Sequence, residues 1–241
     1  MFFSIITSTF NQLENLKKIE PHIKAQAEFL HEDYEWIIAD DGSSDGTPEW
    51  CKERGYKCYH KEKNTGYDLV GALNSAFLLA EGRYIVWVMG DTYPKSDFLF
   101  QLYTSIMSTD RGGMFCGVRY DIDWDRDEVI SPEWRVQLNQ QFPWFKHQPF
   151  EIKGHNSFAL MTLNSMCMSR ADYLDMEGIP VEYTGYGKMD WYMAAWVYYH
   201  NKPLWIVPDA LVYHRKHEDH EDTPHNTKVF EKHIEQLRKN V

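Results

Sequence analysis

The sequence is poor in positive charge and in long apolar runs. Its 25 lysines and arginines stand against 36 aspartates and glutamates, so the formal net charge is −11 at pH 7. Nucleic acids and anionic membranes attract proteins through a concentrated positive field, and we therefore expect neither as a partner. No apolar stretch approaches the roughly 18 residues of a membrane-spanning helix. We expect no transmembrane segment.

Cysteines are also few, and none of them forms a CxxC pair, which favours reduced and buried thiols. The first ten residues are apolar but contain no basic segment, and the polar Asn11 follows them. They are therefore typical of a first strand rather than of a signal peptide. From these features we expect a cytoplasmic protein. The cysteines are Cys51, Cys58, Cys116 and Cys167.

The composition is that of an ordinary folded protein. The chain has 241 residues, of which 43% are hydrophobic and 25% charged, so disorder is not indicated and a single α/β domain fits the length. Aromatic residues make up 15% of the chain. A well-filled core accounts for them, and stacking against sugar rings is the functional alternative.

Strand and helix patterns alternate over the first 120 residues. Short β-branched or aromatic runs predict strands over Phe2–Ser8, Tyr34–Ala39, Lys57–His60, Tyr84–Met89 and Gly113–Val118. Apolar residues at helical spacing predict helices over Leu13–Leu30, Thr47–Arg54, Tyr67–Ala80 and Pro94–Ser108. Such alternation predicts a mainly parallel sheet, and ligands of these sheets bind beyond the carboxyl ends of the strands.

The second half of the chain is less regular. From Arg119 to Gly154 the periodicity weakens, and alternating aspartates at 121, 123, 125 and 127 predict either a polar edge strand or a loop. A calcium loop is not favoured, because its glycine and closing glutamate are missing. Farther on we expect strands over Leu163–Ser169, Leu204–Val207 and Ala210–Tyr213, and helices over Asp190–Tyr199 and Thr227–Arg238.

A dense polar turn follows the second predicted strand. It opens with Asp40 and Asp41, and adjacent carboxylates are costly without partners because like charges raise each other's pKa. The segment Ser8–Asn11 follows the first strand, so both loops should lie side by side at the carboxyl edge of the sheet. A carboxylate and an aromatic ring in this place suit a nucleobase. An ordinary pair of turns is the alternative.

In order and spacing, these segments resemble glycosyltransferase family 2 and its GT-A relatives. The resemblance rests on S-T-F-N (8–11), A-D-D-G-S-S-D-G-T (39–47), N-x-G (64–66) and A-E-G-R-Y-I-V (80–86). It implies an α/β fold of the GT-A type, with a Rossmann-like, mainly parallel sheet flanked by helices and a C-terminal acceptor-side region. We expect one domain over residues 1–241, with a nucleotide-sugar-binding half at 1–118 and an acceptor-binding and catalytic half at 119–241.

The resemblance also implies which residues bind a nucleotide-sugar donor. Asp41 would accept the N3–H of uracil, so the expected donor is a UDP-sugar. Thr9 and Phe10 would contact the base, and Asp40 would support their loop. The residues expected to bind the nucleotide are Ser8, Thr9, Phe10, Asp40, Asp41, Asn64, Gly66 and Gly90.

The fourth predicted strand ends where the family carries an Asp-x-Asp metal motif. Asp91 matches the second Asp of this motif and is the expected ligand of a divalent cation, Mn²⁺ or Mg²⁺. Met89 replaces the first Asp, and this departure bears on metal affinity and on nucleotide preference. The alternative role for Asp91 is that of an ordinary turn residue.

Two later segments complete the resemblance. Thr184–Trp191 resembles the G-(W/Y)-G-x-(E/D)-D segment that precedes a helix, which makes Asp190 the expected catalytic base; a helix N-cap is its alternative role. Pro208–His214 resembles a strand that ends in a metal-binding histidine, and His214 is the candidate ligand; a surface histidine is the alternative. The spacing does not favour a zinc site made of His214, His217, His220 and His225.

Other residues have broader assignments. Arg215 and Lys216 are candidates for neutralising a diphosphate. Met189 stands where many relatives carry an acidic residue that contacts the donor sugar. Sugar stacking or core packing is expected of Trp134, Trp144, Phe145 and Trp191.

Together these assignments predict an inverting, metal-dependent transfer of a sugar from a UDP-sugar to a carbohydrate or other hydroxyl acceptor. Inversion follows from the resemblance and from the single candidate base. A degenerate GT-A domain that binds a sugar or a nucleotide without catalysis is the first alternative, motivated by Met89 and Met189. A nucleotidyltransferase is the second, but it would need a glycine-rich, basic loop that Ser8–Gln12 does not provide.

Overall fold

The computed structural model describes residues 1–62, 66–124, 126, 128–131, 148–217 and 223–239. Within it all four cysteines are unpaired, and three of them are buried as expected, while Cys58 is half-buried. Several residues singled out from the sequence lie outside the described residues: Asn64, Asp125, Asp127, Trp134, Trp144, Phe145 and His220.

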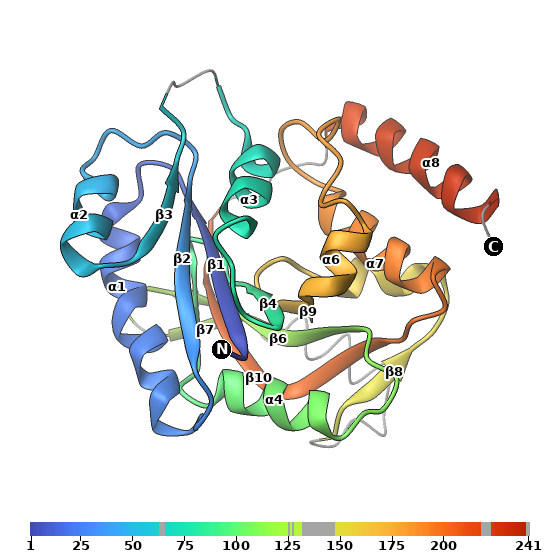
Figure 1. Cartoon of the computed structure of the whole chain (residues 1–241), viewed down its shortest axis with the longest axis horizontal. Coiled ribbons are helices and arrows are strands. Elements are labelled where there is room, and N and C mark those ends of the chain that lie inside the picture. The colour runs from blue at the N-terminus through green and yellow to red at the C-terminus, as the bar shows by residue number, and fades with distance from the viewer. Residues whose placement is uncertain (63–65, 125, 127, 132–147, 218–222, 240–241) are drawn as a thin grey trace.

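Four parallel strands form the first half of a single sheet, in the order β3-β2-β1-β4 (Figure 1). In the central strand Ile6 pairs with Ile37 on one side and with Trp87 on the other. Helices cover both faces, so the central strands are buried along almost their whole length. The bounds are β1 (Phe3–Thr9), β2 (Tyr34–Asp40), β3 (Lys57–His60) and β4 (Tyr84–Trp87).

The hydrophobic core consists of two clusters, one on each face of the sheet. Ile5 packs into the first cluster and Ile6 into the second, because successive side chains of a strand point to opposite faces. The first face is covered by α1 (Leu13–Lys24), α2 (Thr47–Arg54) and α4 (Phe98–Met107). The second face is covered by α3 (Leu69–Phe77), α6 (Arg170–Asp175) and α7 (Met189–Tyr199), with α8 (Pro224–Lys239) packed on α7.

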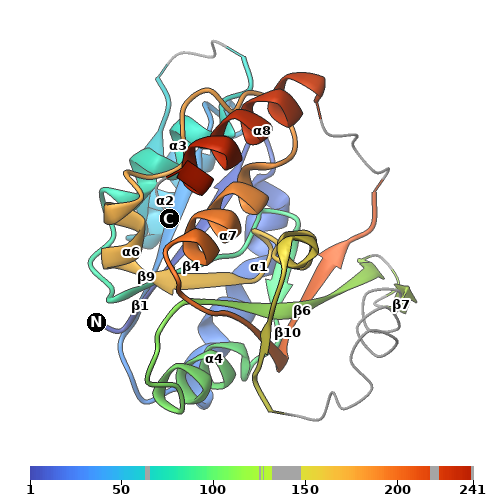
Figure 2. The same cartoon turned by 90° about the vertical axis from the view of Figure 1, so that its right-hand side faces the viewer.

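The sheet continues beyond β4 with strands of both directions (Figure 2). Strand β9 (Met166–Ser169) runs antiparallel between β4 and β6 (Met114–Asp123), and β10 (Leu204–Arg215) runs parallel to β6. The short strand β5 (Thr92–Pro94) pairs with the end of β10 and closes this edge. Two more strands, β7 (Glu128–Ser131) and β8 (Phe150–Ile152), pair with β6 and β10.

The expected mainly parallel α/β sheet is confirmed, with local corrections. The helix predicted over Leu13–Leu30 ends at Lys24 and continues as a 3₁₀ turn, η1 (Ala25–Glu28). The two strands expected over Leu204–Tyr213 are one strand, in which a register shift between Ile206 and Leu211 absorbs the interruption by Pro208. A second 3₁₀ turn, η2 (His155–Leu160), was not expected.

The stretch after Arg119 also resolves into strands. Asp121 and Asp123 lie in β6 and pair with β7, so the polar strand was the right alternative for this part. Strands β5, β7 and β8 have three or four residues each and were not expected, because they form by pairing with β6 and β10. Among the helices that the structure describes, none combines the length and apolar character that a bilayer crossing needs.

Candidate active site

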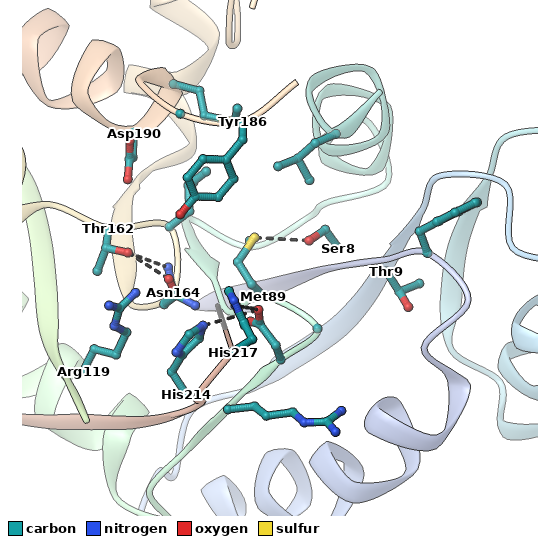
Figure 3. A pocket seen from close by; sticks show the side chains of 18 of the residues that line it. Ser8, Thr9, Met89, Arg119, Thr162, Asn164, Tyr186, Asp190, His214 and His217 are labelled. Carbon is teal, nitrogen blue, oxygen red and sulfur yellow. Dashed lines mark hydrogen bonds and ion pairs between the residues drawn. The ribbon is translucent and has the colours of Figure 1, made fainter. Parts of the chain in front are cut away.

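A pocket of about 740 Å³ opens at the carboxyl ends of β1 and β4, beside the end of β10 (Figure 3). In the close-up, Asp190 lies at one end of the view and Thr9 at the other. The pocket therefore joins segments from both halves of the chain. The sequence-predicted residues that line it are Ser8, Thr9, Phe10, Asp41, Gly90, Asp91, Asp190 and His214.

At the β1–β2 end of the pocket, Asp41 is almost fully buried and both of its carboxylate oxygens have partners. Oδ1 forms an ion pair with Lys61, and Oδ2 accepts the backbone N–H of Asp68 at 2.7 Å. Lys61 also donates to the carbonyl of Gly66 at 2.7 Å. Lys61 and Asp68 therefore hold the carboxylate that is expected to bind the base. Lys61 was not identified from the sequence, because only the parallel pairing of β2 and β3 brings it here.

Asp40 and Gly66 do not line the pocket. Asp40 is fully buried beneath the loop, where Oδ1 accepts the N–H and the hydroxyl of Ser43 at 2.9 and 2.6 Å. Its Oδ2 lies 2.8 Å from Nδ1 of His60. These contacts hold the turn after β2 in shape, so any effect of Asp40 on a nucleotide is indirect.

The loop after β4 carries Met89 and Asp91 where the Asp-x-Asp motif has two aspartates. Met89 occupies the position of the first expected Asp, and its thioether accepts the hydroxyl of Ser8 at 3.2 Å. Gly90 lies against β1 so closely that an added Cβ would be 2.4 Å from the carbonyl oxygen of Ser8. Only a glycine fits this contact, because β1 and β4 are neighbours in the sheet.

Asp91 is held from two sides. Its Oδ1 accepts the hydroxyl of Thr92 at 3.1 Å, and Thr92 in turn accepts the side-chain amide of Asn164 at 2.6 Å. The backbone N–H of Arg215 donates to the carbonyl of Asp91 at 2.7 Å. The last of these bonds ties the β4–β5 loop to the end of β10, so two segments 124 residues apart in the chain share one site.

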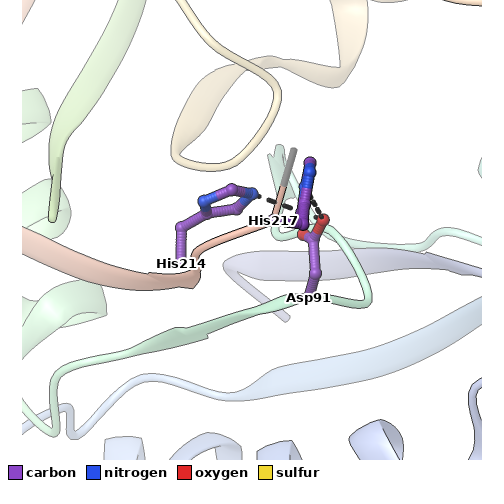
Figure 4. Close-up of side chains that lie close together, drawn as sticks. All are labelled: Asp91, His214 and His217. Atoms are coloured by element: carbon purple, nitrogen blue, oxygen red, sulfur yellow. Dashed lines mark ion pairs between the residues drawn. The ribbon is translucent and has the colours of Figure 1, made fainter. Parts of the chain in front are cut away.

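Two histidines converge on Asp91 (Figure 4). Nε2 of His214 and Nε2 of His217 each lie 3.4 Å from Oδ2 of Asp91. One ligand atom from each of the three residues falls within 4.8 Å of the other two. His217 was expected at most as part of a four-histidine zinc site. The structure places it instead beside Asp91, while His225 contacts the carbonyl of Glu182.

The donor set of this cluster fits a divalent cation. Two ligand atoms bound about 2.1 Å from one ion lie roughly 3.0 to 3.4 Å apart for octahedral and tetrahedral angles, and the two Asp91–histidine distances match this range. Nδ1 of His214 lies 2.8 Å from Oδ1 of Asp121. A histidine held by a carboxylate in this way directs its other nitrogen at a metal.

The charges of the cluster stabilise each other. Burial alone would raise the pKa of Asp91, but the hydrogen bonds of His214 and His217 outweigh it and hold this pKa well below its usual range. Burial alone would lower the pKa of His214, but Asp121 and Asp91 outweigh it and raise this pKa above its ordinary value. Asp91 therefore stays ionised, as a carboxylate ligand of a cation must be.

Asp190 lies in the first turn of α7, at the opposite end of the pocket from Thr9. The N-cap of this helix is Lys188, in a left-handed conformation with φ of 66°, so the alternative of an N-cap role for Asp190 is wrong. Oδ1 of Asp190 accepts the N–H of Trp191 at 2.9 Å. The helix dipole favours a negative charge at this position.

The pocket lining also contains residues to which the sequence gave no role or only a broad one. Tyr67 and Tyr186 line it with exposed rings, 54% and 45% accessible. Arg119 of β6 lines it beside Asp121, with Nε 3.4 Å from Oδ1 of that residue. Arg215 and Lys216 lie on the same wall, as candidates for a diphosphate. Tyr67 and Arg119 stand in no motif and therefore carry no sequence signal, whereas Tyr186 occupies the aromatic position of the segment before α7.

Comparisons with known proteins agree with this architecture. The model of glycosyl transferase family 2 matches residues 4–171. A crystal structure of S. aureus TarS 1-349 in complex with UDP superposes with a TM-score of 0.76 at 18% identity, over 100% of this chain and 66% of that chain. The complex of TarS 1-349 with UDP-GlcNAc gives 0.71 at 17% identity, over 98% and 65%. A comparison with curated protein sequences gives no match.

This chain thus spans a little less than two thirds of the TarS 1-349 chain. A longer TarS structure superposes with a TM-score of 0.70 at 18% identity and is covered over 37% of its length. Identity at this level shows the fold, which is the GT-A type, while the family match extends over most of the sequence. The chain therefore belongs to glycosyltransferase family 2.

Proposed function

We propose that this chain transfers a sugar from a UDP-sugar to an acceptor hydroxyl, with inversion at the transferred carbon and with a divalent cation bound. The observation that carries the proposal is the distribution of carboxylates around one pocket. Asp41 lies in the base-binding loop pair, Asp91 in the cation cluster and Asp190 at the start of α7. TarS, which has the same fold, binds UDP and UDP-GlcNAc, and this supports a uridine donor.

The base end of the pocket suits uracil. Each carboxylate oxygen has two lone pairs, so Asp41 can accept the N3–H of uracil while Lys61 and Asp68 hold it in place. Phe10 and Tyr67 expose 40% and 54% of their surface at this pocket. Their rings offer faces on which a base stacks.

The middle of the pocket suits a diphosphate. A cation held by Asp91, His214 and His217 would supply Lewis-acid stabilisation of the charge that develops on the leaving group. Arg215 and Lys216 line the same wall and add fixed positive charge. The chain as a whole has a formal net charge of −11, so two adjacent basic side chains at the pocket support an anionic ligand such as a diphosphate.

Asp190 is the remaining carboxylate in the described part of the pocket lining. Asp41 is neutralised by Lys61, and Asp91 faces the two histidines. Asp190 therefore takes the proton of the acceptor hydroxyl while the acceptor oxygen bonds to the anomeric carbon and the bond to the diphosphate breaks. A single displacement of this kind inverts the configuration.

A thermal-unfolding scan with UDP, with and without Mn²⁺, tests the donor assignment against a GDP control. A ligand at about 100 times its dissociation constant adds about 2.7 kcal/mol to the stability of the native state. We expect a rise in Tm with UDP that grows when Mn²⁺ is added. A rise with GDP alone would overturn the uracil role of Asp41, and no rise with either nucleotide would overturn the proposed donor class.

Met89 favours one rival, a GT-A domain that binds its ligand without turnover. Its thioether replaces a carboxylate next to the cation cluster and is already bonded to Ser8. Release of UDP from UDP-sugars by the purified chain separates the two functions. Measurable release, abolished by Asp190→Asn, excludes the rival; UDP binding without any release supports it.

A further inference from the structure

We propose that Lys61 makes the base end of the pocket selective for uracil over cytosine, because it keeps the carboxylate of Asp41 charged and fixed. This inference rests on the proposed function in one respect, namely that Asp41 receives the base of the donor. Lys61 itself does not line the pocket. It is therefore a positioning residue, which acts on the nucleotide through Asp41 and not by direct contact.

Lys61 and Asp41 form an ion pair that is shielded from solvent, with side chains that are 12% and 6% exposed. The ammonium group of Lys61 donates to Oδ1 of Asp41 and, at 2.7 Å, to the carbonyl oxygen of Gly66. Two of its three N–H bonds are thereby used inside the protein. The positive charge is therefore held beside Oδ1 and is not free to swing into solvent.

The second oxygen of Asp41 is fixed by the backbone. Oδ2 accepts the N–H of Asp68 at 2.7 Å, and Asp68 is the N-cap of α3. The carboxylate of Asp68 in turn accepts the N–H of Gly71 at 2.9 Å, so this N–H belongs to a capped helix start. Because rotation of Asp41 would break a charge-assisted hydrogen bond on each oxygen, its remaining lone pairs keep a fixed direction.

Uracil and cytosine have the same size and differ at the edge that Asp41 would meet. Uracil carries an N–H donor at N3, whereas N3 of cytosine is an acceptor. An ionised carboxylate can only accept, so it bonds to uracil and repels the lone pair of cytosine N3. A protonated carboxyl group has an O–H to donate and would bond to cytosine instead. The charge of a fixed Asp41 therefore distinguishes the two bases.

Lys61 maintains this charge. A buried carboxylate without a cation is costly in its ionised form and takes up a proton instead. Tyr67 does not replace the lysine, since burial and the charge of Asp41 raise the pKa of its phenol to about 12 and the phenol carries no positive charge. The nearby His60 contacts Asp40. In the part of the chain that the structure describes, Lys61 is the cation paired with Asp41.

Calorimetric titration with UDP and with CDP, each at the same Mn²⁺ concentration, measures this selectivity without any assay of turnover. The two ligands share the ribose and the diphosphate, so the ratio of their dissociation constants reports the base alone. We expect the unmodified chain to bind UDP on the order of 100-fold more tightly than CDP, since one base makes a charge-assisted hydrogen bond that the other loses. In Lys61→Met the ratio should fall below about tenfold.

Further variants separate selectivity from folding, and the Tm of each without nucleotide shows whether it is folded. Lys61→Gln keeps a hydrogen-bond donor without the charge and should lose selectivity, whereas Lys61→Arg keeps the charge and should retain most of it. Lys57→Met is the matched control, because it removes an ion pair with Glu35 from the same strand and does not line the pocket. Its ratio should be unchanged. A loss of UDP and CDP affinity by one common factor in Lys61→Met would overturn the inference.

Asp41→Asn distinguishes this inference from the proposed function. Its amide both donates and accepts, so it should also lose the preference for UDP. Loss of the preference in Asp41→Asn, with a normal ratio in Lys61→Met and Lys61→Gln, overturns the role of Lys61 and leaves the uracil role of Asp41 intact. Binding of neither nucleotide by the unmodified chain overturns the proposed donor class and this inference with it.

Discussion

At the scale of single residues, three aspartate carboxylates lie in different surroundings within one pocket. Asp41 is paired with Lys61, Asp91 faces two imidazoles, and Asp190 lies at a helix start with one oxygen on a backbone N–H. Neighbours rather than residue type therefore distinguish the three carboxylates, and the proposed base-binding, cation-binding and proton-accepting roles rest on this difference.

The base role predicts a specific kinetic defect. Asp190→Asn keeps the size and the helix contact of the side chain but cannot accept the acceptor proton. We expect sugar transfer to fall by roughly 10²- to 10⁴-fold while the Tm rise caused by UDP is preserved. Asp110→Asn, at an exposed position before β6, serves as the control and should retain full activity. Near-normal turnover by Asp190→Asn would show that another group is the base.

The Asp41–Lys61 pair predicts a stability effect. Both side chains are largely shielded from solvent, at 6% and 12% exposure. Lys61→Met leaves the carboxylate without its cation, and we expect the free energy of unfolding to fall by about 3 kcal/mol. The double variant Lys61→Met/Asp41→Asn should recover part of this loss. Urea unfolding of the four proteins in the cycle gives the coupling energy, and strict additivity would contradict a direct interaction.

At the scale of elements, Glu20 ties helix α1 to the end of α2. Its Oε1 accepts bonds from Lys24 at 2.7 Å, Arg54 at 3.1 Å and Tyr56 at 2.7 Å. Burial alone would raise the pKa of Glu20, but the bonds of Lys24 and Tyr56 and the charges of Lys24 and Arg54 outweigh it and lower this pKa. Because the pKa of Glu20 is lower in the folded than in the unfolded state, ionised Glu20 stabilises the fold. This stabilisation is fully present above the ordinary glutamate pKa of about 4.3 and is lost as the pH falls through the folded-state pKa.

This linkage predicts a pH-dependent variant. Glu20→Gln should lower the free energy of unfolding at pH 7 by about 1 to 2 kcal/mol, and the gap to the unmodified protein should narrow below pH 4. Chemical unfolding of both proteins at pH 7, 5 and 3.5 measures this difference in the free energy of unfolding. Glu14→Gln is the matched control on the same helix, since Glu14 is 81% exposed and pairs with Lys17 one turn away. A gap that stays constant down to pH 3.5 would refute the role of ionised Glu20.

At the scale of the whole molecule, the last helix fixes the loop in front of the proposed base. Asn226 of α8 is fully buried, and its amide donates to the carbonyls of Tyr186 and Gly187 at 3.1 and 2.9 Å. Its Oδ1 accepts the N–H of Thr184 at 3.0 Å. The loop that carries Tyr186 into the pocket thus depends on a helix about 40 residues farther along the chain.

Asn226→Ala should therefore affect both stability and activity. Loss of three buried hydrogen bonds should lower the free energy of unfolding by about 2 to 3 kcal/mol. Displacement of the loop next to Asp190 should lower kcat on the order of tenfold at a temperature where the variant remains folded. Lys228→Ala, exposed on the same helix, should leave both unchanged. A stability loss with normal kcat would restrict Asn226 to a structural role.

Many of the secondary-structure elements were predictable from local sequence patterns. The strands β1 to β4, the helices between them and the turn at Asp40–Thr47 were predictable because hydrophobic period, caps and turn residues are properties of neighbouring residues. The family resemblance added the positions of Asp41, Asp91, Asp190 and His214, all of which line the pocket. Their individual roles and the division of the chain at residue 118 remain predictions.

The remainder depended on contacts between distant segments. His217, Lys61 and Asn226 carry no local signal, because each acquires its role from a partner 20 to 126 residues away, and pairing in the sheet or docking of α8 creates that proximity. Short strands such as β5 form only because β10 offers them a partner. The sequence by itself determined the alternating α/β architecture and the chemistry at the strand ends. The tertiary structure decided which of those groups meet, since the geometry of the sheet edge depends on long-range register rather than on local composition.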